Sequence, residues 1–243
     1  MIDRIEIAAV KPLARRSNLY SGVAILAMLA TIFSAQAQDA KTSYPSMGPL
    51  DQYLMERQDE ITLARSAAPK SISQDAEVMV LGRHGYESVV KGKNGFVCMV
   101  QRSWVAGLDD PEFWNPKNRS PICLNLPAVR SFLPQVIQKA EWALAGRSKA
   151  QMYQDIKSAL TRKELPTPEI GAMCYMMSKQ AYLGDQAGRW HPHLMFFLPL
   201  TDPASWGANL PGSPVFGAQD VPGALTIFFV PVDKWSDGTA ASG

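Results

Sequence analysis

Residues 86–102, Tyr86-Glu-Ser-Val-Val-Lys-Gly-Lys-Asn-Gly-Phe-Val-Cys-Met-Val-Gln-Arg102, carry the strongest fold signal in the chain. The stretch holds two runs rich in β-branched and aromatic residues, 86–91 and 96–102, separated by Gly92-Lys-Asn-Gly95. An Asn-Gly pair between such runs is typical of a tight β-hairpin, because both residues adopt the positive φ angles that the turn requires. We therefore expect an antiparallel hairpin here, with further strands added beside it.

The other segments with strand character lie on both sides of this stretch, and a helical region separates the last four from the first. Segment 224–232 is a continuous apolar run, which is typical of a strand in the interior of a sheet. The expected strands are 77–82, 172–178, 192–198, 215–216 and 224–232.

Three helices are expected in addition. One covers 49–67 and begins with a proline, which is favoured at the first helical position. A second covers 127–146, where Pro134 should kink or divide it. The third begins at Ser148, and Gln151 completes a capping box. This order predicts an α+β fold, with a mainly antiparallel sheet, an N-terminal helix and a central helical pair.

A secretory signal precedes this domain. Residues 19–33 form an uncharged apolar run that follows the pair Arg15-Arg16 and is followed by Ala35-Gln-Ala37. A positive flank, a short apolar core and a small-x-small exit predict a signal peptide that is cleaved after Ala37. The run is shorter than the roughly 20 residues that a bilayer span needs, so we expect no stable membrane span after cleavage.

The chain therefore divides into a signal peptide at 1–37, a mobile N-terminal segment at 38–48 and a single α+β domain at 49–243. We expect a periplasmic or extracellular location. The full chain has 24 basic and 22 acidic residues, and 1–37 holds four of the basic and two of the acidic ones. The mature part carries no net charge, which gives no electrostatic case for nucleic acid as a partner.

Three cysteines allow one disulfide and one remaining thiol, with three possible choices. We favour Cys98–Cys123, because they lie 25 residues apart, one in a strand and one in the proline-rich loop 103–126. Closing such a loop stabilises a fold by roughly 3 kcal/mol on the chain-entropy account. Cys174 lies in an apolar run, Ala172–Met177, which is typical of a buried free thiol.

Three short motifs resemble a group of uncharacterised secreted bacterial proteins. They are Lys91-Gly-Lys-Asn-Gly-Phe-Val-Cys98, Pro121-Ile-Cys123 and Trp190-His-Pro-His-Leu-Met195. That group shares a G-x-N-G-aromatic-x-C hairpin, a later P-x-C and a strand of P-H-hydrophobic-Met type. The resemblance covers roughly residues 85–232. It implies no activity, but it supports the pairing of Cys98 with Cys123.

His191-Pro-His193 is the most suggestive group of polar side chains. In an extended chain the two histidines would share one face at roughly 6.7 Å, which could hold zinc with a third ligand. His84, Asp202 and Glu87 are the candidates for that ligand, and the site would then serve a metal-assisted hydrolase. The simpler interpretation is that one histidine hydrogen-bonds within the sheet and the other lies at its surface.

Arg83-His84-Gly85 is similar to the R-H-G of histidine phosphatases, in which the histidine is phosphorylated and arginines hold the phosphoryl group. The second histidine of that family could only be His191 or His193. The alternating α/β pattern of that fold is absent from this sequence, however, and the tripeptide can simply be a turn. We regard this activity as a remote alternative.

No other catalytic or cofactor motif appears. The sequence lacks a G-x-S-x-G elbow, a Walker loop, a dinucleotide fingerprint and a C-x-x-C pair. The sequence therefore favours a secreted, non-catalytic domain that binds an unknown ligand or protein partner, with zinc at the histidines as the only cofactor to consider.

Overall fold

One eight-stranded sheet runs through the part of the chain that this computed structural model describes, which is residues 44–185 and 191–241. The strand order is β2-β1-β3-β4-β5-β6-β8-β7, and every neighbouring pair is antiparallel except β1 and β3. The strands are β1 (Glu77–Gly82), β2 (Gly85–Val90), β3 (Val97–Gln101), β4 (Ser120–Leu124), β5 (Met173–Met176), β6 (His193–Pro199), β7 (Phe216–Asp220) and β8 (Leu225–Pro231).

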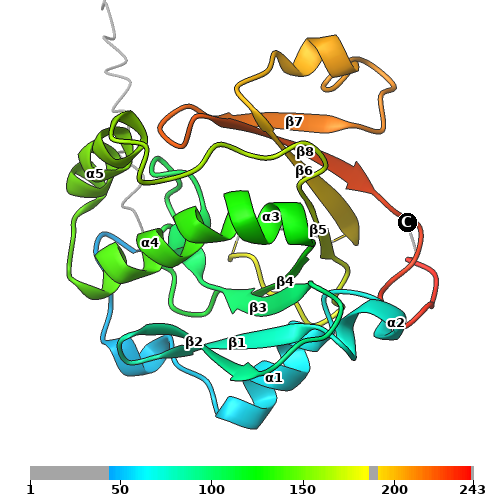
Figure 1. Ribbon diagram of the computed structural model, residues 1–243, viewed down its shortest axis with the longest axis horizontal. Helices are drawn as coiled ribbons and strands as arrows, with labels where there is room; N and C mark the ends of the chain where they lie inside the picture. Colours follow the sequence, from blue (N-terminus) through cyan, green and yellow to red (C-terminus); the bar gives the residue numbers. More distant parts are fainter. Residues whose placement is uncertain (1–43, 186–190, 242–243) are drawn as a thin grey trace, which may run out of the picture. The chain divides into compact units, whose positions relative to one another are not determined.

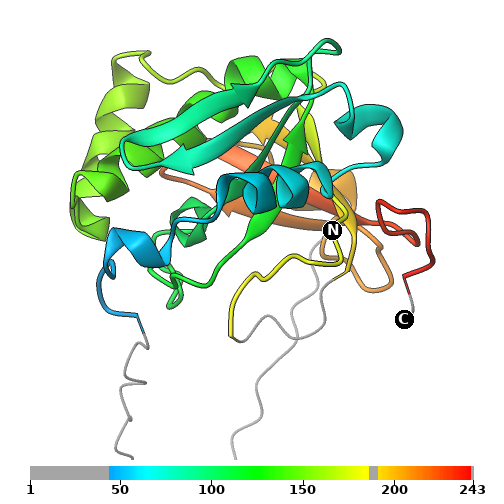
Figure 2. The same ribbon diagram turned by 90° about the horizontal axis from the view of Figure 1, so that it is seen from below.

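Helices cover both faces of the central strands, which confirms the α+β class (Figure 1). Helices α3 and α4 lie on one face, while α1 packs on the other, against β1, β3 and β4 (Figure 2). The helices are η1 (Leu50–Gln52), α1 (Arg57–Arg65), α2 (Lys70–Ser73), η2 (Ser103–Val105), α3 (Leu126–Ser131), α4 (Leu133–Leu144), α5 (Lys149–Thr161) and η3 (Pro203–Trp206).

Alternation along the strands sends every second side chain to the α3–α4 face. Met99, Ile122 and Cys174 are fully buried there, against the apolar sides of the two helices. Phe132, at the junction of α3 and α4, stacks on Phe197 of β6 with ring centroids 3.8 Å apart. This face forms the main hydrophobic core.

The opposite face carries the disulfide. Cys98 of β3 and Cys123 of β4 are cross-strand partners, with Cα atoms 4.0 Å apart, and their bond lies under α1 beside Ala64. The predicted pairing is confirmed, and Cys174 is the buried free thiol. The loop placement of Cys123 was wrong, because residues 120–124 form a central strand between β3 and β5.

A buried ion pair ties α1 to the end of β3. Arg102 and Glu60 are almost completely buried, and Nη2 of Arg102 donates to Oε1 of Glu60 at 2.9 Å. Arg102 also donates to the carbonyl oxygens of Tyr53 and Val100, and Oε1 of Glu60 accepts the backbone N–H of Leu81. The pair therefore joins η1, α1, β1 and β3 at one point.

The Asn-Gly hairpin was predicted wrongly. Strands β2 and β3 do run in opposite directions, but β1 lies between them. The connection 91–96 crosses the start of β1, where the N–H of Lys93 donates to Asp75 and the N–H of Glu77 donates to Phe96. Gly92 is required at the crossing, since a Cβ there would lie 2.3 Å from the backbone nitrogen of Glu77.

Two of the predicted helices are divided in the structure. The expected helix 49–67 is interrupted, because residues 53–56 are not helical and separate η1 from α1. The expected helix 127–146 is divided near Pro134 into α3 and α4, as the missing proline N–H predicts. The capping box of Ser148 and Gln151 is present at the start of α5.

Residues 1–37, which the sequence predicts to be a signal peptide, lie outside the described residues. Of the segment 38–48, the structure describes 44–48, in which Met47 packs against a buried cluster and Tyr44 donates to Asp185. No helix in the described part of the chain is long and apolar enough to cross a membrane.

Strand β7 is an edge strand of the sheet, and a side chain occupies part of its free backbone hydrogen-bonding groups. The carboxamide of Asn209 donates to the carbonyl oxygen of Gly217 at 2.8 Å and accepts its N–H at 3.0 Å. Asn209 holds a positive φ of 62°, a conformation that asparagine tolerates better than most residues. It occupies the backbone groups that a further strand would use.

Candidate functional site

A cavity of about 360 Å³ opens at one end of the sheet, on the α3–α4 face. Because these strands are antiparallel, the end of β3, the start of β4, the end of β5 and the start of β6 lie at the same end of the sheet. The loop 102–119, which joins β3 to β4, forms the opposite wall. The cavity is lined by Gln101, Ser103, Val105, Ala106, Asp110, Asn118, Ser120, Met176, Leu183, His193, Met195 and Phe229.

The floor of this cavity, which we call the His193 pocket, is apolar. Met176 and Met195 are nearly buried, and Phe229 lies beside Met195 on the neighbouring strand. Methionine side chains adapt their shape to what they contact, and aromatic rings offer a flat surface. The floor can therefore accept flat apolar groups of different shapes.

Two residues in the lining of the His193 pocket each have a buried polar side-chain atom without a hydrogen-bond partner among the described residues. These are Nε2 of Gln101 and Oγ of Ser103, on residues that are 4% and 2% exposed. Their neighbours are paired, since Ser120 donates to Asn118, which in turn donates to the carbonyl oxygen of Leu183. A buried polar atom without a protein partner costs about 1–3 kcal/mol.

His193 lies at the start of β6, next to the apolar floor of the pocket. Its Nδ1 lies 3.0 Å from the carbonyl oxygen of His191, which can only accept, so Nδ1 carries the proton. Burial lowers the pKa of His193, and the carbonyl of His191 opposes this in part. The imidazole is therefore neutral at neutral pH, and its ring makes an edge contact with Phe229.

Among the described residues that line the His193 pocket, the only ionisable side chain besides His193 is Asp110. One of its oxygens accepts the backbone N–H of Glu112 at 2.7 Å. The described part of the lining includes no lysine or arginine.

The loop that closes the His193 pocket is held firmly to the domain. The side chain of Trp104 is completely buried, and Phe113 and Trp114 belong to the same cluster. Lys149 of α5 donates to the carbonyl oxygen of Asp110 at 2.9 Å. These contacts fix the wall of the pocket from behind.

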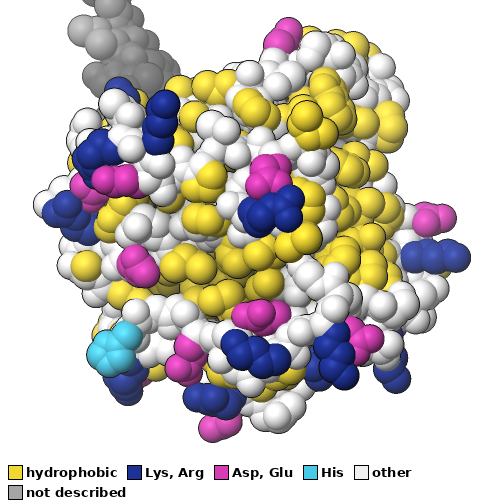
Figure 3. Space-filling view, viewed as in Figure 1, with side chains coloured by type: hydrophobic (Ala, Val, Ile, Leu, Met, Phe, Trp, Pro, Cys, Tyr) yellow, Lys and Arg dark blue, Asp and Glu magenta, His cyan; other side chains and the backbone are white. Residues whose placement is uncertain are grey.

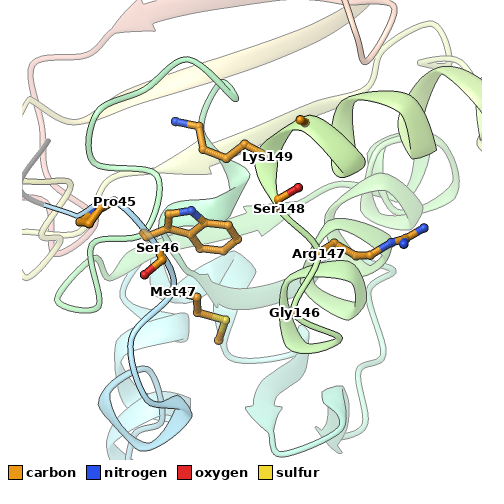
Figure 4. A pocket seen from close by; sticks show the side chains of 9 residues that line it. Pro45, Ser46, Met47, Gly146, Arg147, Ser148 and Lys149 are labelled. Carbon is orange, nitrogen blue, oxygen red and sulfur yellow. The ribbon is translucent and has the colours of Figure 1, made fainter.

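A second cavity, of about 510 Å³, lies at the start of α5 (Figure 4). Its two cations are already engaged: Arg147 forms two bonds to Asp155, and Lys149 bonds to the loop carbonyl. In Figure 4 these two side chains extend in opposite directions. Ser148 and Gln151 satisfy each other's backbone groups in the capping box. This cavity has a weaker case as a site than the His193 pocket.

Exposed hydrophobic side chains also gather across the middle and right of the face drawn in Figure 3. Leu126 and Phe216 are about half exposed, at 48% and 53%, and Ile170 is fully exposed. Single exposed hydrophobic residues are common on soluble proteins. We assign no site to this surface.

The three predicted metal ligands are not brought together. His84 lies exposed in the turn between β1 and β2, and His193 lies four strands away, about 19 Å at the usual strand spacing. His191 is exposed and contributes its carbonyl oxygen to His193. Within the described ranges no group of three histidine, cysteine or acidic side chains could hold a metal ion. Zinc at His191 and His193 stays a prediction without a third ligand.

Arg83-His84-Gly85 belongs to the turn of the β1–β2 hairpin, which is the simpler of the two interpretations of this tripeptide. The Nη2 of Arg83 donates to Asp51 at 2.7 Å. A mainly antiparallel sheet is also not the scaffold of the histidine phosphatases that the tripeptide resembles. Nothing in this geometry favours phosphoryl transfer at His84.

Sequence reasoning missed Gln101 and Ser103. Neither belongs to a motif: Gln101 is the last residue of β3 and Ser103 is the first residue of η2. Their place in the lining depends on the loop 102–119, which folds back over the sheet. His193 was found, but as a metal ligand rather than as part of a mostly apolar pocket.

Fold and site together define an α+β domain with a pocket of small-molecule size at one end of its sheet. No family model, curated protein or solved structure matches the chain.

Proposed function

We propose that this protein is a periplasmic or extracellular, non-catalytic binding domain that takes a small ligand into the His193 pocket. The observation that carries the proposal is a cavity of about 360 Å³ that has an apolar floor and polar side chains in its wall. The predicted signal peptide and the disulfide support an oxidising location outside the cytosol.

The arrangement supports binding better than catalysis. Nucleophilic catalysis needs a nucleophile that is hydrogen-bonded to a base. The hydroxyl of Ser120 donates to the amide oxygen of Asn118 instead, and Asp110 accepts a backbone N–H. Cys174 lies in the core, where burial raises its pKa and keeps it as the unreactive thiol.

The test is to map the binding of indole, a neutral flat probe, by NMR on ¹⁵N-labelled protein comprising residues 38–243. We expect saturable shifts at the side-chain amide of Gln101 and at the backbone of Ser103 and His193. A variant that fills the cavity, Ala106→Trp, should abolish them. The matched control is Ala150→Trp, which fills the cavity at the start of α5 and should leave them unchanged.

Two results would refute the proposal. One is the absence of saturable shifts at 5 mM indole. The other is a set of shifts that persists in the folded Ala106→Trp variant, because the probe would then bind elsewhere. The dispersion of the NMR spectrum reports whether each variant is folded.

A further inference from the structure

Three side chains in the lining of the His193 pocket carry atoms that bind soft metal ions. They belong to Met176, His193 and Met195. The thioether sulfur of methionine and the neutral imidazole of histidine suit Cu(I) better than they suit hard ions such as Mg²⁺. Thioethers also stay available in an oxidising location, because they do not form disulfides as thiols do. The metal chemistry of these side chains is independent of the small ligand proposed above.

The register of β5 and β6 sets the three side chains next to one another on one face of the sheet. Met176 and His193 are directly opposed across the two strands, and Met195 follows His193 by two residues. Directly opposed residues have Cβ atoms about 5 Å apart, and alternate residues of one strand lie about 6.7 Å apart. Methionine has a flexible, unbranched side chain, so both sulfur atoms can turn toward the imidazole. The three side chains are therefore spaced to share one ion.

The hydrogen bond of His193 is of the kind found behind metal-ligating histidines. Its Nδ1 lies 3.0 Å from the carbonyl oxygen of His191, which holds the proton on Nδ1 and places the lone pair on Nε2. A ligating histidine almost always donates its second ring N–H in this way, often to a backbone carbonyl. The ring also makes an edge contact with Phe229, with centroids 5.7 Å apart. Both contacts restrict the direction of Nε2.

The surroundings of these side chains suit a singly charged soft ion. Phe229 contributes to an apolar shell, which favours Cu(I) over the more strongly hydrated Cu(II). Asp110 adds a carboxylate to the same lining, and its negative charge attracts a cation. We infer that the His193 pocket binds one Cu(I) ion through Nε2 of His193 and the sulfur atoms of Met176 and Met195.

The first test uses Ag(I), an air-stable ion that prefers the same donor atoms as Cu(I). It is added to protein comprising residues 38–243 with ¹³C-labelled methionine methyl groups, whose NMR signals are assigned by single replacements with leucine. One equivalent should shift the signals of Met176 and Met195 and then saturate. Met173 should keep its signal, because alternation along β5 places it on the opposite face of the sheet.

The contribution of each ligand is measured as Cu(I) affinity, by anaerobic competition with bicinchoninate. Met176→Leu, Met195→Leu and His193→Gln should each weaken binding at least about tenfold, since changes even in the partners of metal ligands cost that much. Leucine nearly conserves the volume of methionine and keeps the core filled. The matched controls, Met173→Leu and His191→Gln, should keep the wild-type affinity, the second because His191 takes part only through its carbonyl oxygen.

Cys174 is the other soft donor near the pocket, and a further variant excludes it. It is the cross-strand partner of Met195, but its side chain is completely buried in the core. Cys174→Ala should therefore bind Cu(I) with the wild-type affinity.

Any of three results would overturn the metal site. The first is the absence of saturable shifts at both Met176 and Met195 with Ag(I), which decides the matter on the wild-type protein even if a variant does not fold. The second is loss of Cu(I) affinity in Cys174→Ala, because the thiol would then be the ligand. The third is wild-type affinity in both leucine variants. Binding of Ag(I) at the pocket without binding of indole would refute the proposed function alone.

Discussion

At the scale of single residues, the buried Glu60–Arg102 pair joins four segments of the fold, η1, α1, β1 and β3. Both side chains are removed from water, and each is held by backbone groups as well as by its partner. A buried charge that loses its partner is far more costly than an exposed one. No sequence pattern predicts this pair, since the two residues lie 42 positions apart and belong to no motif.

Replacing the buried arginine should destabilise the protein strongly. We expect Arg102→Met to lower the free energy of unfolding by about 3–5 kcal/mol, because Glu60 is left charged and buried. Arg57→Met is the matched control: Arg57 pairs with Glu87 at the surface, where both side chains are more than half exposed, and should cost less than about 1 kcal/mol. Urea denaturation measures both. Equal losses in the two variants would contradict this account.

His193 should make stability depend on pH. Its folded-state pKa is lowered below the ordinary value of 6.5, so the unfolded chain binds its proton more readily. The contribution of His193 is fully present above that value and is lost as pH falls from about 7 toward the folded pKa. We expect His193→Gln to reduce the slope of the unfolding free energy between pH 7.5 and 5.5.

The control for the histidine is His84→Gln, at the exposed β1–β2 turn, which should keep the wild-type slope. Urea unfolding at several pH values gives the slopes. One proton accounts for at most about 1.4 kcal/mol per pH unit. A slope that is identical in wild type and His193→Gln would show that His193 is not the group responsible.

At the scale of elements, the edge strand β7 illustrates how one side chain can control association. An exposed strand edge is a template for another chain. Here the carboxamide of Asn209 already occupies both backbone groups of Gly217.

Removing that side chain should allow association through β7. We expect Asn209→Gly, which keeps the positive φ without strain, to form dimers or larger species as concentration rises, measured by size exclusion with light scattering. Asn94→Gly is the control, because Asn94 also makes two side-chain bonds to backbone groups, but in the connection between β2 and β3. A monomeric Asn209→Gly variant at high concentration would contradict the prediction.

The elements themselves were predictable to different degrees, for physical reasons. Pro134 and the Ser148–Gln151 capping box act within one turn of helix, so the division of the helical pair and the start of α5 followed from the sequence. The signal at Gly92–Gly95 correctly indicated a reversal of the chain. It could not indicate that β1 occupies the space between the two strands, because strand pairing is a long-range choice.

The candidate site was less predictable than the elements. His193 stands out in the sequence because histidine is rare in this chain, with three in 243 residues. The pocket depends on the path of the loop 102–119, which no local pattern determines. The burial of Trp104, Phe113 and Trp114 fixes that path, and their positions in a proline-rich loop did not show that they are core residues.

At the scale of the whole molecule, the sheet is shared by all parts of the core. Each of the three hydrophobic clusters includes residues of at least one strand, and the disulfide joins two central strands. Local loss of one cluster would therefore expose the others.

We expect the domain to unfold in one cooperative transition. Urea curves followed by tryptophan fluorescence and by far-ultraviolet circular dichroism should coincide. The double variant Cys98→Ala, Cys123→Ala should lower the free energy of unfolding by roughly 3 kcal/mol and still give a single transition. Curves with separate midpoints would show that the sheet does not couple the clusters.

The position of Cys174 has a further consequence. It lies on β5, next to the strand that carries Cys123, but on the other face of the sheet from the disulfide. The sheet thus separates the thiol of Cys174 from the Cys98–Cys123 disulfide, with which it could otherwise exchange. An alkylating reagent will therefore modify Cys174 only in molecules whose sheet has opened, and the rate of modification will report the rate of global opening. Disulfide exchange in the folded protein should be negligible.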